Sequence, residues 1–123
     1  ILSRRKEIID RYNKGLKGLP ITVVTHYTSD IVSSGHLYII NLNDKDAEQR
    51  NKFIEKMAGL GVATNVHYKP LPMHTGYKKL GFNIEDYPNA YKQFKNVVTL
   101  PLHTCLSDED VDYVIECVKE CLK

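Results

Sequence analysis

The run HLYIINL, residues 36–42, limits the possible folds more than any other stretch of the sequence. It is apolar at almost every position and rich in aromatic and β-branched residues, which favours a strand. A strand without a polar face needs cover on both sides, so a central position in a sheet is expected. The rest of the chain must supply the elements that cover this sheet.

The remaining pattern alternates short strands with amphipathic helices. Strands are expected over 21–27, 62–68 and 97–102, and helices over 1–16, 43–61, 73–80, 87–96 and 107–123. Asp44 or Asp46 can cap the second of these helices, and Ser107 and Asp110 have capping-box spacing at the start of the last one. This order predicts an α+β fold with a small mixed, largely antiparallel sheet of about four strands and helices packed mainly on one face.

Charge and cysteine content exclude several classes of function. The 123 residues suffice for one domain, and the net charge of +2 gives no reason to expect a nucleic-acid or membrane partner. The sequence has no apolar run that is long enough for a membrane helix. Cys105, Cys117 and Cys121 are an odd set without disulfide spacing, so we expect reduced thiols in a cytoplasmic protein.

Common catalytic signatures, such as the P-loop and G-x-S-x-G, are missing. None of the five histidines lies three or four residues from another, so no metal site is expected. The segment GYKKLGF, residues 76–82, could suggest a nucleic-acid surface. Without a basic excess, the simpler expectation is that Tyr77, Leu80 and Phe82 pack inward while the lysines stay in solvent.

The segment TNVHYKPLPMHTGY, residues 64–77, carries the candidate functional groups. His67, Tyr68 and Lys69 follow a predicted strand directly, and strand ends often present functional groups. An imidazole, a phenol and an ammonium group can all donate to phosphate or sugar oxygens. Two prolines after Lys69 stiffen the loop. From spacing alone, a binding loop and an ordinary irregular connection remain equal alternatives.

Taken together, these segments resemble the C-terminal part of the DegT/DnrJ/StrS family of pyridoxal-phosphate-dependent sugar aminotransferases. The resemblance is carried by HLY at 36–38, HYKP at 67–70, YPNA at 87–90 and LPLH at 100–103, followed by an acidic helix start. RRKEIIDRYNKGL, residues 4–16, resembles the segment that leads into that domain. The resemblance covers nearly the whole chain, and the ordered series is specific where no single motif would be.

The resemblance implies a single C-terminal small domain over residues 1–123, with Ile1 to Leu16 as the leading helix that joins it to a missing large domain. The catalytic Schiff-base lysine and the cofactor's aspartate partner would lie in that large domain, so the chain alone is predicted to be inactive and to bind no pyridoxal phosphate tightly. His67, Tyr68, Lys69 and His36 would contact the substrate. Gly35 stands where the family often has a bulkier residue, which would loosen the packing there.

The intact enzyme implied by the resemblance is a homodimer. It would transfer an amino group from glutamate to a keto-sugar nucleotide in polysaccharide or glycan biosynthesis. The alternative from a different class is a free-standing α+β module that binds a small ligand or a protein. That alternative predicts that the natural gene extends no further upstream than about residue 1. The aminotransferase predicts a longer upstream reading frame.

Overall fold

The computed structural model describes the whole chain, residues 1–123, and its sheet is built around the predicted central strand. Strand β2 (Tyr38–Leu42) lies between β1 (Ile21–Val23) and β3 (Val97–Leu100), and both pairings are antiparallel. Ile40 is the centre of the register, because it pairs with Val23 on one side and with Val98 on the other. The α+β prediction and the central position of this run are confirmed.

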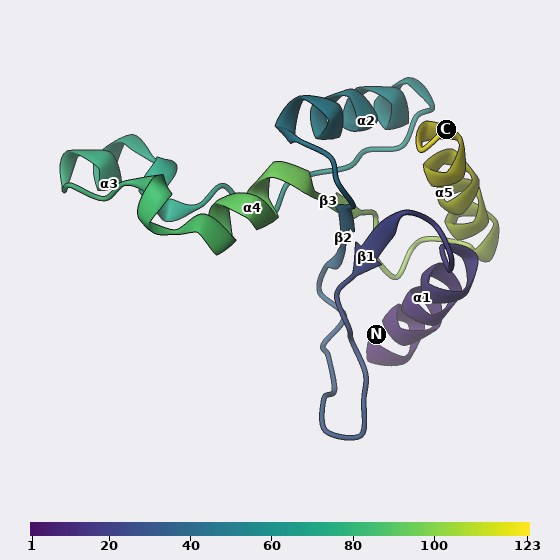
Figure 1. The fold of residues 1–123 in the computed structure, drawn as a ribbon. Helices are drawn as coiled ribbons and strands as arrows, with labels where there is room; N and C mark the ends of the chain where they lie inside the picture. The colour runs from purple at the N-terminus through teal and green to yellow at the C-terminus, as the bar shows by residue number, and fades with distance from the viewer.

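One face of the sheet carries the core, as the strand period requires. Tyr38, Ile40 and Leu42 are buried, while the residues between them are half-buried on the opposite face. Helices α1 (Leu2–Gly15), α2 (Ala47–Gly59) and α5 (Asp108–Cys121) cover the buried face with their apolar stripes (Figure 1). The prediction of helices mainly on one face is therefore confirmed.

Side-chain caps set the ends of two core helices. Asp46 forms a capping box with Gln49 at the start of α2, and Gly61, with φ of 76°, follows its last turn. Ser107 and Asp110 form the predicted capping box at the start of α5. These caps satisfy amide groups that the helix itself leaves without partners.

The cysteines agree with the prediction of free thiols. Cys117 and Cys121 are buried in α5, Cys105 is exposed, and none of them is in a disulfide.

Helix α5 packs on α1, where Arg11 reaches Asp108 and Asp112 with nitrogen–oxygen distances of 2.9 and 2.6 Å. No helix is both long and apolar enough to span a membrane.

The sheet has three strands instead of about four, because 62–68 contributes a single bridge between Asn65 and Thr99. In the same register the next hydrogen-bonded pair would be Ala63 with Pro101, and a proline has no N–H to donate to the ladder. Strand β1 is also shorter than predicted. After Val23 the chain leaves the sheet in a loop that returns at the start of β2 (Figure 1).

Residues 68–96, which we call the arm, project away from the sheet (Figure 1). The arm contains α3 (Thr75–Lys79), α4 (Pro88–Asn96) and the 3₁₀ turns η1 (Leu71–Met73) and η2 (Ile84–Asp86), and none of their residues is buried. The prediction that Tyr77, Leu80 and Phe82 pack inward is wrong. Tyr77 and Phe82 only meet edge to face, and Leu80 is 75% exposed, because no core element of this chain lies beneath them.

Candidate functional site

Two of the predicted site residues, His36 and His67, line one surface hollow of about 280 Å³. His36 comes from the turn before β2, and His67 follows the single bridge at Asn65. The hollow therefore forms where the start of the central strand meets the end of the 62–67 segment. Its lining is completed by Leu37, Ala63, Thr64, Asn65, Thr99, Leu100, Pro101 and Leu102.

The hydroxyl of Thr99 holds the imidazole of His67. Nδ1 of His67 lies 2.9 Å from Oγ1 of Thr99, which is buried in β3. The backbone of Thr99 also exchanges both hydrogen bonds with Asn65, at 3.1 and 2.8 Å. His67 is therefore tied to the sheet by its ring and by its neighbouring backbone, while Nε2 makes no hydrogen bond within the chain.

Tyr68 and Lys69 lie beside the hollow and not in its lining. The peptide bond between His67 and Tyr68 is cis, and their rings meet edge to face at 4.5 Å. Tyr68 is 68% exposed, and Lys69 is exposed without an ion pair. The carbonyl of Lys69 accepts a hydrogen bond from Nε2 of His74 at 3.3 Å. The structure thus brings all four predicted residues near one edge but only the two histidines into the hollow.

Thr99 and Thr64 are the residues that sequence reasoning missed. Thr99 is the one polar residue in the strand VVTL, a signal that could have marked it. Oγ1 of Thr64, which lines the same hollow, is buried without a hydrogen-bond partner. Thr99 orients His67, so the imidazoles of His36 and His67 are the groups of this hollow that suit phosphate or sugar oxygens.

His26 is not part of the site. It is buried against Tyr38, with the rings stacked at 5.7 Å, and its Nδ1 lies 2.9 Å from Oγ of Ser33. Burial lowers the pKa of His26, so its ring stays neutral in the folded protein. These contacts give it a structural role in the core.

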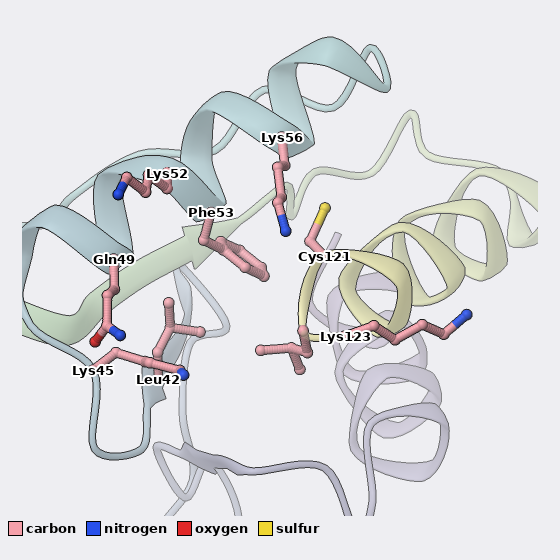
Figure 2. A pocket seen from close by; sticks show the side chains of 9 residues that line it. Leu42, Lys45, Gln49, Lys52, Phe53, Lys56, Cys121 and Lys123 are labelled. Atoms are coloured by element: carbon pink, nitrogen blue, oxygen red, sulfur yellow. The ribbon is translucent and has the colours of Figure 1, made fainter.

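A second hollow, of about 220 Å³, is rich in lysine and shares no residue with the first (Figure 2). Lys45, Lys52, Lys56 and Lys123 surround a floor that includes Leu42 and Phe53. Two of these cations are already paired, Lys52 with Glu48 at 2.7 Å and Lys123 with Glu120 at 2.6 Å. Figure 2 shows Lys56 extending toward Cys121, whose thiol pKa is raised by burial. No predicted site residue lies in this hollow.

Comparison with known proteins agrees with this architecture. A family model described as the DegT/DnrJ/EryC1/StrS aminotransferase family matches residues 1–119. Spr1654 of Streptococcus pneumoniae, assigned as a sugar aminotransferase, superposes with a TM-score of 0.97 at 51% identity over 99% of this chain and 31% of its own. The spore coat polysaccharide biosynthesis protein SpsC of Bacillus subtilis is 33% identical over 98% of this chain and 32% of its own.

The fold and the sequence therefore place this chain in the aminotransferase class. The chain belongs to the DegT/DnrJ/EryC1/StrS aminotransferase family. It spans about a third of the length of the relatives that it matches.

The family depends on pyridoxal phosphate, and Spr1654 has been solved in a PLP form. Neither of these two hollows fits that group. The hollow at His36 and His67 has no amine and no carboxylate in its lining. The lysine-rich hollow has amines but no carboxylate that could pair with the pyridine nitrogen.

Gly35, close to the first hollow, is tightly packed, since an added Cβ would lie 3.0 Å from Ile9. This contradicts the expectation that the packing at Gly35 would be loose.

Proposed function

We propose that this chain is the C-terminal small domain of a pyridoxal-phosphate-dependent aminotransferase. The complete enzyme would transfer an amino group from glutamate to a keto-sugar nucleotide for polysaccharide or glycan biosynthesis. The observation that carries the proposal is the family match over residues 1–119 in a chain that is a third as long as its relatives. A relative from Helicobacter pylori, 27% identical over 96% of this chain, is a UDP-4-amino-4,6-dideoxy-N-acetyl-beta-L-altrosamine transaminase, which favours a nucleotide-sugar substrate.

In this proposal the hollow at His36 and His67 is one wall of the substrate pocket. Nε2 of His67 and the hydroxyl of Tyr68 would donate to sugar or phosphate oxygens, and Lys69 would add a positive charge for the diphosphate. A nucleoside diphosphate is anionic, and no carboxylate lines the hollow to repel it. These residues bind and orient the substrate, and none of them performs the amino transfer.

The cofactor supplies the chemistry of amino transfer when it is bound. Because the chain spans about a third of the length of its relatives, the catalytic lysine would lie in a large domain that precedes Ile1, and α1 would connect the two. The chain alone is then inactive and does not bind the cofactor tightly. The complete enzyme would be a cytoplasmic homodimer that acts on no nucleic acid or membrane.

The test combines cofactor trapping with an activity assay. The purified chain and the complete product of its gene are each incubated with pyridoxal phosphate, reduced with borohydride and mapped by mass spectrometry. The expected result is one modified lysine in the complete product, outside residues 1–123, and no unique lysine in the chain alone. The complete product should aminate a UDP-keto-sugar in a glutamate-dependent reaction. Stoichiometric modification of Lys69, or a gene that begins near Ile1, would refute the proposal.

A further inference from the structure

The lysine-rich hollow lies outside the proposed substrate pocket. It opens between the turn that follows β2, one face of α2 and the end of α5 (Figure 2). Its lining contains four amines, one amide and one thiol but no carboxylate. The thiol of Cys121 stays neutral, because burial raises its pKa. A concave surface with this excess of positive charge favours an anion.

Two of the four lysines of this hollow are free to bind such an anion. Lys52 and Lys123 are each held by a glutamate, at 2.7 and 2.6 Å. Lys45 and Lys56 form no ion pair with any carboxylate of the chain. The hollow therefore offers two ammonium groups that have no partner within the protein.

An apolar floor separates the two free lysines. Figure 2 shows the side chains of Leu42 and Phe53 between those of Lys45 and Lys56. Gln49 lines the same hollow, and its Oε1 accepts a backbone N–H of the helix cap at 3.1 Å, which leaves its NH₂ group as a free donor. Gln49 and Lys56 are two turns apart on α2, about 10 Å along its axis. A ligand that reaches both ends needs two anionic groups with an apolar chain between them.

We propose that the lysine-rich hollow binds a short organic dicarboxylate. One carboxylate meets Lys45 and the NH₂ group of Gln49, and the other meets Lys56. The carbon chain between them lies on Leu42 and Phe53, where it removes apolar surface from water. The hollow of about 220 Å³ is smaller than the usual site for a drug-sized ligand, which agrees with so short a molecule. This inference does not rest on the proposed function.

Leucine methyl NMR of the complete gene product tests where the ligand binds. Leu42 and Leu122 line this hollow, whereas Leu100 lines the hollow at His36 and His67. Three probes are titrated. Pimelate has two carboxylates at the ends of an apolar chain, heptanoate has a chain of the same length with one carboxylate, and malonate has two carboxylates with almost no chain. Pimelate should shift the methyl signals of Leu42 and Leu122 and bind there more tightly than either of the other two.

Lysine substitutions then identify the groups that hold the carboxylates. Lys45→Gln and Lys56→Gln should each weaken the binding of pimelate about threefold, as expected for the loss of one solvent-exposed ion pair. Lys52→Gln is the matched control, since Lys52 lines the same hollow one turn from Lys56 but is already paired with Glu48. It should change the binding by less than about 1.5-fold. All three lysines are exposed, so these variants should fold like the unchanged protein.

Each other outcome overturns the inference. Equal binding of malonate would make the hollow a general anion surface, and equal binding of heptanoate would leave the second carboxylate without a role. Equal weakening by Lys52→Gln would assign the effect to diffuse positive charge. Shifts at Leu100 alone would locate the ligand in the other hollow, and no shift would mean that no dicarboxylate binds. The assay needs neither cofactor nor turnover, so a gene product that binds pimelate without transaminating refutes only the proposed function.

Discussion

Replacing Thr99 with valine tests whether the sheet orients the imidazole of His67. Valine has nearly the same shape as threonine, so the substitution removes the hydroxyl and little else. That hydroxyl lies 2.9 Å from Nδ1 of His67 and has no other acceptor in the structure. Because a buried hydroxyl proton needs an acceptor, it points to Nδ1, and the proton of the neutral ring then lies on Nε2. Thr99 thus makes Nε2 the donor that faces a substrate.

The hydrogen bond sets the size of the expected effect. A net loss of about 1 kcal/mol is typical for one hydrogen bond, and water can still reach the half-buried ring of His67. For a domain of this length, such a loss lowers the midpoint of thermal unfolding by about 4 °C. The substitution should also change the tautomer of His67, because without the hydroxyl the proton of the neutral ring can lie on either Nδ1 or Nε2.

The assay is nitrogen-15 NMR of the imidazole together with urea unfolding, both on the 123-residue chain. Thr99→Val should convert one tautomer of His67 into a mixture and lower the free energy of unfolding. Thr99→Ser, which keeps the hydroxyl, should keep the tautomer. Thr22→Val is the matched control, since its hydroxyl donates to Asn43 at 2.8 Å on an exposed edge, and it should change stability by less than about 0.5 kcal/mol. An unchanged tautomer in Thr99→Val would refute the reasoning.

Three further predictions test the fold. Gly15→Ala should cost about 1–3 kcal/mol in urea unfolding, because its Cβ would lie 2.6 Å from Ile115, whereas Gly59→Ala, which meets nothing within 4 Å, should cost nothing. Ser107→Ala should cost about 1 kcal/mol by removing the cap of α5, and equal stability would exclude that cap. Burial lowers the pKa of His26 below 6.5, so the unfolded chain binds a proton that the folded chain does not, and stability should fall as the pH drops below about 6.5. His26→Gln should flatten this dependence, and an unchanged pH profile of unfolding would assign it to other groups.

The core could be predicted from the sequence because its signals are local and agree with one another. The apolar run 36–42 predicted the central strand, and the spacing of Ser107 and Asp110 predicted a cap that the structure contains. The stripe along α5 is buried as its period requires, at Val111, Val114, Ile115 and Val118. Such patterns hold where one chain supplies both sides of a contact.

The arm and the hollow could not be predicted in the same way. Tyr77, Leu80 and Phe82 have the spacing of packed residues, but no core element of this chain meets them. The 62–68 segment has strand composition, yet it pairs with the sheet only between Asn65 and Thr99, and the next partner in that register would be Pro101. Thr99 and His67 are far apart in sequence, so their contact appears only once β3 is placed in the sheet. In each case the deciding partner lies outside the local pattern.

A pair of leucine substitutions compares the contributions of the core and of the arm to the stability of the chain. Leu100 is 2% exposed in the core, and Leu80 is 75% exposed on the arm. Leu100→Ala should therefore cost about 2–5 kcal/mol in urea unfolding of the chain, since it removes buried methyl groups and leaves a cavity. Leu80→Ala should change that free energy by less than about 0.5 kcal/mol, because the side chain is already in water. If Leu80→Ala costs as much as Leu100→Ala, the arm folds back onto the core in solution and Leu80 is buried there. If only Leu100→Ala is costly, the stability of the chain comes from the sheet and its covering helices, and Leu80 on the arm does not contribute to it.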